Sequence, residues 1–386
     1  MKCLFYIFVL SSIYLNAQDS ILNKPSTVEL RGYVKYMDQL SFIDKPDTGY
    51  LSSLIHNRLN FKWTPTKNWL FRIEARNRIF YGDQLKSNRT FMKTIGQDQG
   101  IIHLSKVWVD EYALGLHSIV DRSLVNYTNE HFDITVGRQR INWGLNIVWN
   151  PNDIFNTYNF FDFDYEERPG SDALRIQYNW KGFSGFEFAA KKGNSKDDQV
   201  AALLFRSNHL GYDYQCLAGI YNKELVLGIG WAGSIKDAGF KGEFSYFHPN
   251  KNLIDTFGVL NGSMSFDYSF KNGFYIHLSG YYNSIGNDKM NMMSTQNFFD
   301  VNPKQLLPFR FAGFFQMSKQ INPLFTFGIT NIYSPTNQTW VMIPNIHYSI
   351  SSNWEVTLLG QSFFSDVNSV YRTLGNSIFL RFKCSF

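Results

Sequence analysis

Beyond its first fifteen residues the sequence has no long apolar run, although 44% of its 386 residues are hydrophobic. A membrane-spanning helix needs about 20 consecutive apolar residues, so helical membrane proteins are excluded. Charged residues are also few, at 18%. Aromatic residues are abundant, at 17%, and this excludes a disordered chain. With a mean hydropathy of −0.25, such a chain must alternate apolar and polar residues closely, which favours β-structure.

Cysteines and known catalytic motifs are scarce too. Apart from Cys3 in the N-terminal apolar segment, the cysteines are Cys216 and Cys384. Two distant cysteines form no disulfide framework, and no C-x-x-C pattern is present for a metal. The sequence also lacks G-x-S-x-G, H-E-x-x-H and P-loop motifs. We therefore expect no cofactor, no metal and no enzymatic activity.

The first 17 residues are typical of a secretory signal peptide. Lys2 precedes an apolar core of about a dozen residues, and Ala17 is the small residue before a polar start. Cleavage after Ala17 would leave residues 18–386 as a single domain with a net charge of +4. We therefore expect an exported protein.

From residue 27 onward, segments of about ten to thirteen residues with a period of two are separated by turn residues. Alternation repeated over so many segments is typical of a transmembrane antiparallel β-barrel, an all-β fold that closes on itself. The predicted strands are 27–38, 50–62, 68–81, 117–128, 131–143, 172–181, 183–192, 198–206, 210–221, 223–233, 238–248, 257–270, 273–285, 306–318, 323–333, 339–350, 354–364 and 374–386. They number eighteen, although sixteen remain possible because 198–233 divides ambiguously.

The predicted connections differ in length between the two ends of the barrel. Short turns alternate with long connections at 82–116, 144–171, 248–256, 286–305 and 365–373. Bacterial barrels have short periplasmic turns and longer extracellular loops. This asymmetry favours the outer membrane, with its lipid and lipopolysaccharide as surroundings.

The last predicted strand carries a further signal. Ile378, Leu380, Phe382, Cys384 and Phe386 alternate with mostly polar residues. An amphipathic strand with Phe382 and a final Phe386 resembles the signal by which outer-membrane proteins are recognised by the barrel-assembly machinery. The alternative is an amphipathic strand of a secreted soluble protein.

Alternation also assigns faces to the basic residues. On strand 68–81, Arg72, Arg76 and Arg78 oppose an apolar face that contains Ile73 and Ile79. A basic residue facing lipid at the bilayer midplane costs about 2–4 kcal/mol, so these arginines should face the lumen. Because nearly all inward cations fall on the first six predicted strands, we expect a positively charged wall. We expect no nucleic-acid partner, since these charges lie inside the pore.

Strand 131–143 breaks its own alternation. Strict parity from Val136 would direct Arg138 and Arg140 toward lipid. A one-residue bulge at Gly137 would turn both arginines and Asn142 inward, with Ile141 and Trp143 outward, and glycine favours such a bulge. We therefore predict a bulge at Gly137.

The segment from Gly137 to Arg175 contains the most distinctive motif. It reads G-R-Q-R-I-N-W-G over 137–144, N-P-N-D over 150–153 and E-E-R-P-G-S-D-A-L-R over 166–175. It resembles a group of Gram-negative outer-membrane barrels of the porin and alginate-export type. The resemblance covers residues 132–180, and it implies a channel-like barrel.

The same segment is strongly acidic, with a net charge of −5 between Gly144 and Asp172. A loop with this charge beside an arginine wall should fold into the lumen, because partly buried charges need partners. We therefore predict an inward loop over 144–171. The residues expected at the pore constriction are Arg72, Arg76, Arg78, Arg138, Arg140, Arg175, Asp153, Glu166, Glu167, Arg168 and Asp172.

These features favour a porin-like channel for small polar or anionic solutes. The first alternative is a plugged structural or secretion-associated barrel, in which the charge pairs only brace the wall. The second is an outer-membrane hydrolase, because His277 and Ser279, like His347 and Ser349, share a strand face. In barrels resembling outer-membrane phospholipase the serine is followed by Asn-Gly, whereas here Gly280 and Tyr281 follow Ser279.

Overall fold

The computed structural model describes residues 27–43, 45–157, 159–161, 170–182, 184–195, 198–250, 257–287, 301–367 and 370–386. The signal peptide expected over residues 1–17 lies outside the described residues. So do Glu166, Glu167 and Arg168, which were expected at the constriction.

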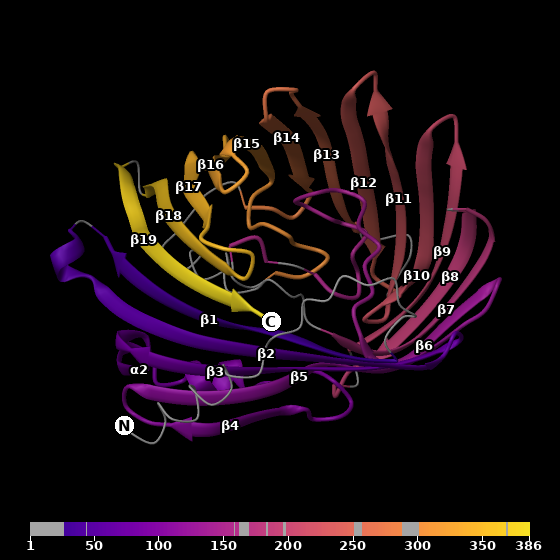
Figure 1. The fold of residues 1–386 in the computed structure, drawn as a ribbon. Helices are drawn as coiled ribbons and strands as arrows, with labels where there is room; N and C mark the ends of the chain where they lie inside the picture. The colour runs from indigo at the N-terminus through magenta and orange to yellow at the C-terminus, as the bar shows by residue number, and fades with distance from the viewer. Residues whose placement is uncertain are drawn as a thin grey trace.

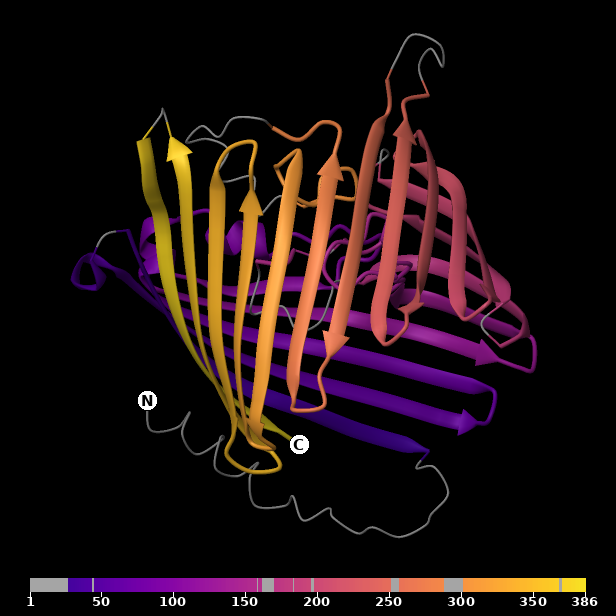
Figure 2. The same ribbon diagram turned by 90° about the horizontal axis from the view of Figure 1, so that it is seen from above.

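Eighteen antiparallel strands form one closed barrel, in which each strand pairs with the next and β19 pairs with β1 (Figures 1 and 2). The barrel strands are β1 (Val28–Phe42), β2 (Tyr50–Thr66), β3 (Trp69–Gly82), β5 (Leu114–Thr128), β6 (Phe132–Gln139), β7 (Ser171–Lys181), β8 (Ser184–Lys192), β9 (Gln199–His209), β10 (Tyr212–Tyr221), β11 (Glu224–Ile235), β12 (Ala238–His248), β13 (Val259–Ser269), β14 (Phe274–Asn283), β15 (Phe311–Asn322), β16 (Phe325–Ser334), β17 (Thr339–Ser349), β18 (Trp354–Val367) and β19 (Val370–Ser385). The eighteen-stranded alternative is therefore confirmed over the sixteen-stranded one.

The connection between β3 and β5 contains structure that the alternation did not predict. It holds the short helices α2 (Asp83–Ser87) and α3 (Phe91–Ile95) and the strand β4 (Ser105–Asp110). β4 pairs with residues 115–119 of β5, whereas β6 pairs with residues 123–128 of the same strand. A short 3-10 turn, η1 (Pro46–Thr48), lies between β1 and β2.

Every predicted strand overlaps an observed one, and the differences lie at strand ends. The long connection expected at 365–373 is wrong, because β18 and β19 extend to Val367 and from Val370. β15 starts at Phe311 instead of residue 306, since Leu306, Leu307 and Phe309 are buried in a cluster inside the barrel. β6 ends at Gln139 instead of residue 143.

The exposure of the side chains distinguishes the inward face of each strand from its outward face. On β3, Arg76 and Arg78 are buried while Ile73 on the opposite face is 49% exposed. The outward faces of other strands carry large apolar residues such as Phe188 and Leu278. A sheet whose inner side is polar and whose outer side is apolar suits a barrel surrounded by lipid. Among the described residues, no helix is long and apolar enough to cross a membrane.

The connections are sorted by length, though incompletely. Those at one end are turns of two to four residues, for example between β2 and β3 and between β9 and β10, and the longest ones lie at the opposite end (Figure 2). Short links such as 222–223 also occur at the long-loop end.

The barrel interior contains segments of the long connections (Figure 1). Ile141, Trp143 and Ile154 pack in one apolar cluster with inward residues of β7–β13. Val148, Trp149 and Phe161 pack in a second cluster with residues of β14–β17. A third cluster places Leu85 and Met92, of α2 and α3, against β1–β3.

Candidate channel constriction

A dense group of basic residues lines the inward face of β1–β3. Lys35, Arg58, Arg76 and Arg78 are between 0% and 8% exposed, and His56 is 1% exposed. Arg58 pairs across the sheet with Arg76, and His56 with Arg78. Their proximity is a direct result of register, because residues on neighbouring strands that pair share a face. Arg72 lies nearer the short-turn end, where its side chain is 41% exposed.

A β-bulge inserts the acid that neutralises part of this group. Glu74 pairs with Arg122 and Ala75 with Val120, which leaves Asp121 as the extra residue on β5. Asp121 is 3% exposed and accepts hydrogen bonds from Arg58 at 2.6 Å and Arg76 at 2.9 Å. Alternation along the sequence does not predict that Asp121 faces inward, because the bulge changes which residues of β5 lie on the inward face.

His117 links the same wall to β4. Its Nδ1 lies 3.1 Å from the Arg78 guanidinium and its Nε2 lies 2.8 Å from the Ser105 hydroxyl. The guanidinium can only donate, so Nδ1 accepts and Nε2 carries the proton. The Ser105 hydroxyl in turn donates to the Gly96 carbonyl at 2.9 Å. His117 therefore cannot accept a proton from Ser105, and the pair fixes β4 to the wall.

Barrel closure extends the basic wall across the seam. Lys383 pairs with Lys35 and Arg381 pairs with Met37, so both side chains of β19 face inward. Glu355 on β18 lies 3.2 Å from Lys383. Alternation along the sequence placed nearly all inward cations on the first six predicted strands, and it carried no signal that β19 continues this wall.

A second charged group lies on β7–β9. Glu187 accepts hydrogen bonds from Arg175 at 2.6 and 3.0 Å and from Gln177 at 2.8 Å. The Trp143 indole also donates to Glu187, at 2.6 Å, and Arg206 lies 3.8 Å away. Arg175 thus faces the lumen, but it belongs to this group and not to the wall of β1–β3.

Arg138 and Asp172 do not join either inward group. Gly137 has a φ of 116°, which glycine tolerates, yet β6 pairs with β5 and β7 without any register shift at this position. The predicted bulge at Gly137 is therefore wrong, and the bulge lies on β5 at Asp121. Arg138 keeps the outward parity of Val136, and its pairing partner Asp172 shares that face.

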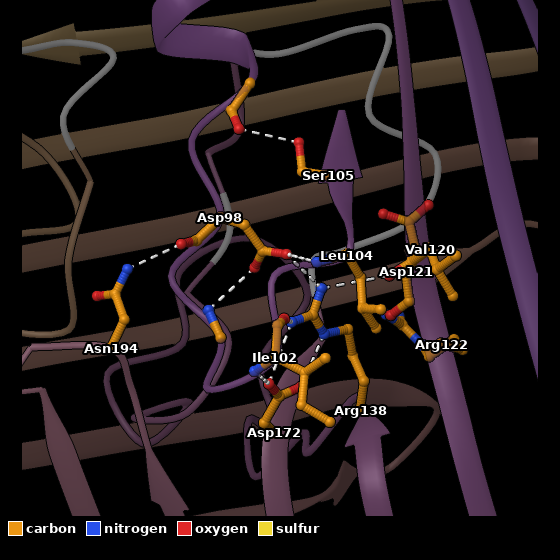
Figure 3. Close-up of polar contacts among 12 residues, drawn as sticks. Asp98, Ile102, Leu104, Ser105, Val120, Asp121, Arg122, Arg138, Asp172 and Asn194 are labelled. Atoms are coloured by element: carbon orange, nitrogen blue, oxygen red, sulfur yellow. Dashed lines mark hydrogen bonds and ion pairs between the residues drawn. The ribbon is translucent and has the colours of Figure 1, made fainter. Parts of the chain in front are cut away.

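Arg138 is nevertheless only 4% exposed, because the chain segment 98–104 covers it (Figure 3). Its guanidinium donates to Asp172 at 2.7 Å, to Asp98 at 2.8 Å and to the Ile102 carbonyl at 2.7 Å. Segment 98–104 occupies the edge of the wall that β6 leaves free when it ends at Gln139. An outward arginine is therefore satisfied by a loop from the β3–β5 connection.

Asp98 holds this segment in place. Burial of the Asp98 carboxyl acts to raise its pKa, but the Arg138 guanidinium and the amides of Gly100 and Leu104 outweigh burial and lower the pKa. The Asp98 carbonyl also accepts a hydrogen bond from Asn194 at 3.0 Å, from the β8–β9 connection. Asp98 therefore joins three parts of the chain, and the sequence analysis missed it because its partners are remote.

The chain enters the lumen directly after β6. Ile141 and Trp143 are 0% and 2% exposed and pack against the inner wall, whereas Arg140 and Asn142 are exposed. The expectation that Ile141 and Trp143 face outward is wrong, because β6 has already ended and the alternation continues in a segment that lies against the wall. The opposite, solvent-exposed side of this segment carries Arg140 and Asn142.

Asp153 lies deeper in the same segment. It is 1% exposed, and the amide of Asn152 beside it donates to Glu243 of β12 at 3.1 Å. Asp153 is thus placed with the β11–β12 wall. Those predicted constriction residues that the structure describes accordingly divide among the β1–β3 wall, the β7–β9 group, the lumenal segment and the outward pair of Arg138 and Asp172.

The candidate hydrolase pairs are not assembled. His277 is 0% exposed, and among the residues that the structure describes neither of its ring nitrogens has a hydrogen-bond partner. Its ring centroid lies 5.1 Å from that of Phe314. The Ser279 hydroxyl donates to the Met264 carbonyl at 3.0 Å. His347 contacts Thr357 and Glu355. Within the described part of the chain, no group of three or more His, Cys, Asp or Glu residues could hold a metal ion.

No family model matches the sequence, and no curated protein matches it. Solved structures of Occ and Opd outer-membrane porins match over most of the barrel. Acinetobacter baumannii OccAB4 has a TM-score of 0.59 and 9% identity over 94% of this chain and 99% of its own. Pseudomonas aeruginosa OccK5 (OpdH) has a TM-score of 0.56 and 10% identity over 93% and 98%. Pseudomonas aeruginosa OpdK, solved with vanillate, has a TM-score of 0.56 and 9% identity over 93% and 99%. The chain therefore has the fold of these porins.

Proposed function

We propose that this chain is an outer-membrane, porin-like channel for small anionic solutes. The observation that carries the proposal is the basic wall that runs from β19 across the seam to β5. Its inward basic residues exceed the inward acids Glu29, Glu74 and Asp121, so the wall is positively charged overall. Its inward basic members are Arg31, Lys35, Arg58, Lys62, Arg72, Arg76, Arg78, Arg122, Arg381 and Lys383.

A charged wall inside a low-dielectric barrel concentrates ions of the opposite sign. Rings or walls of basic side chains select anions in the same way in other pores. Vanillate, present in the OpdK structure, is a carboxylate on an aromatic ring. Small carboxylates are therefore the first solutes to test on this protein. Outer-membrane lipid and lipopolysaccharide would surround the barrel, and the barrel-assembly machinery would insert it through the strand that carries Phe382 and Phe386.

The second candidate function is a plugged barrel with a structural or secretion-associated role. The packing of residues 141–157, 159–161 and 306–309 along the inner wall favours it, since these segments fill part of the lumen. In that case the basic wall would brace the segments and pass no solute.

Planar-bilayer conductance of the refolded chain separates these functions. We expect discrete channels whose reversal potential under a salt gradient shows anion preference, and a lower current when a small carboxylate such as vanillate is added. Arg140→Ala should weaken the anion preference, because Arg140 is exposed on the lumenal segment.

Arg138→Ala is the matched control, because it removes the same charge from the outward face. A folded Arg138→Ala barrel should keep its selectivity. Equal effects of the two substitutions would contradict the lumenal role of Arg140. A folded wild-type barrel that conducts no ions would instead establish the plugged alternative.

A further inference from the structure

Glu243, on β12, is a carboxylate buried inside the barrel. It is 0% exposed, and no ion pair joins it to a cation among the described residues. An isolated buried carboxylate is costly unless other donors satisfy its oxygens. At Glu243 these donors all belong to the lumenal segment.

Three backbone amides converge on the two oxygens of Glu243. Its Oε1 accepts hydrogen bonds from the amides of Leu145 and Asn146, the latter at 2.6 Å, and its Oε2 accepts one from Asn152 at 3.1 Å. Successive amides that point at one anion form a nest, which stabilises negative charge without a cation. The carboxylate therefore joins two turns of the segment to one point on the wall.

The wall beside Glu243 is shaped to receive Asn152. The Asn152 side chain donates to the Ile229 carbonyl at 2.9 Å and accepts from the Ser245 hydroxyl at 2.7 Å. Gly228 leaves the space that this amide occupies, because a Cβ there would clash with the Asn152 Oδ1. The seat for Asn152 is thus built from β11 and β12 together.

A second asparagine is held in the same manner on β13. The Asn146 side chain donates to the Ser263 hydroxyl at 2.7 Å and accepts from Ser265. The Trp143 carbonyl accepts from Gln215 at 2.7 Å, on β10. Polar groups on four neighbouring strands therefore match the segment, and Glu243 lies at their centre.

We infer that Glu243 is the positioning residue that fixes segment 140–156 against the inner wall of the barrel and thereby sets the width of the pore. This inference rests on the proposed channel function. Because the segment carries Arg140 and Asn142 on its exposed side, its position also places these side chains in the solute path. Loss of the Glu243 carboxylate should release the segment while the strands remain paired.

The test combines amide exchange with conductance on the full chain. In Glu243→Gln, exchange in the peptide that contains residues 140–156 should become about tenfold faster or more, because charge-assisted hydrogen bonds are lost. The single-channel conductance should rise, and the anion preference should change as Arg140 moves. Retention of the folded, heat-modifiable form would show that the barrel itself is intact.

Glu355→Gln is the matched control, because it neutralises another inward carboxylate that contacts Lys383 and His347 and not the segment. It should leave exchange in residues 140–156 unchanged. Should Glu243→Gln fail to fold, Glu243→Asp keeps the charge but shortens the reach, and we expect it to show a smaller acceleration.

Unchanged exchange in the folded Glu243 variant would overturn the inference. Faster exchange with unchanged conductance and selectivity would also overturn it, since the segment would then not set the pore. A folded wild-type barrel that conducts no ions would disprove the channel function and with it the role of Glu243 in setting the pore. The exchange result would still decide whether Glu243 anchors the segment.

Discussion

At the scale of single residues, the strand face on which a charged side chain lies does not by itself determine whether that side chain is buried or exposed. Arg138 shares the outward face of β6, yet it is buried by segment 98–104. The bulge predicted at Gly137 rested on the premise that an outward arginine must be exposed to lipid. The actual solution is a tertiary one, and local alternation carries no signal for it.

Asp121 is the residue on which the basic wall depends most. It lies between Arg58 and Arg76, and all three side chains are nearly inaccessible. Removing one member of a buried ion pair typically costs about 3–5 kcal/mol, because the remaining charge is left without a partner. We therefore expect Asp121→Asn to lower the free energy of unfolding by about this amount, measured by urea titration in detergent micelles.

The exposed hydrogen-bond pair of Asp213 and Asn208 provides the comparison. Asp213→Asn should change the free energy of unfolding by less than about 0.5 kcal/mol, as surface substitutions usually do. If Asp121→Asn were as mild as Asp213→Asn, the arginines of the wall would not depend on the bulge residue.

At the scale of elements, the barrel strands are predictable and the connections are not. Alternation is a local property, so all eighteen strands could be located from the sequence. β4, α2 and α3 are only five or six residues long, and each forms because a strand edge or the inner wall receives it. The end of β6 at Gln139 has the same origin, since segment 98–104 and β4 occupy the edge beyond it.

The attachment of segment 98–104 should depend on pH. Interactions of Asp98 lower its pKa below the ordinary 3.8. The stability contributed by its carboxylate is therefore present above pH 3.8 and is lost as the pH falls through the lowered pKa of the folded state. The protection factors of the amides in residues 97–106, which correct for the slower intrinsic exchange at acid pH, should fall as the pH is lowered, whereas those in β7 should not.

Asp98→Asn should reproduce the acid state at neutral pH. We expect faster trypsin cleavage after Lys106, because the segment that precedes β4 is released. Asp110→Asn, at the exposed end of β4, is the control and should leave the cleavage rate unchanged. An Asp98→Asn variant as resistant as wild type would show that the remaining hydrogen bonds of Arg138 suffice to hold the segment.

At the scale of the whole molecule, closure of the barrel brings basic residues from both ends of the chain into one wall. Pairing of β19 with β1 brings Lys383 beside Lys35, although the two residues are separated by almost the entire chain. Alternation along single strands indicates which cations face inward, but it carries no information on which strands meet at the seam. Alternation therefore located the inward cations of the first strands and missed Asp121, which the bulge inserts, and Lys383, which closure adds. It also missed the inward packing of Trp143, which lies outside this wall.

The seam itself is the last structural element that the chain must complete. Gly32 and Phe386 exchange backbone hydrogen bonds of 2.8 and 2.9 Å at its end. A Cβ at Gly32 would clash with the Arg58 carbonyl and meet the Phe386 ring. At Gly32, therefore, β1, β2 and Phe386 approach one another closely.

Gly32→Ala should therefore impair closure of the barrel as a whole. Overpacking of this kind costs about 1–3 kcal/mol, and here it acts on the contact with the largest sequence separation, whose loop-closure entropy is also the greatest. We expect a smaller heat-modifiable fraction and slower refolding into lipid vesicles. Gly375→Ala, on β19 at the other side of the seam from Gly32, adds the same methyl group where no atom lies within 4 Å. It should refold like wild type, and equal refolding of the two variants would show that the close approach at Gly32 does not limit closure.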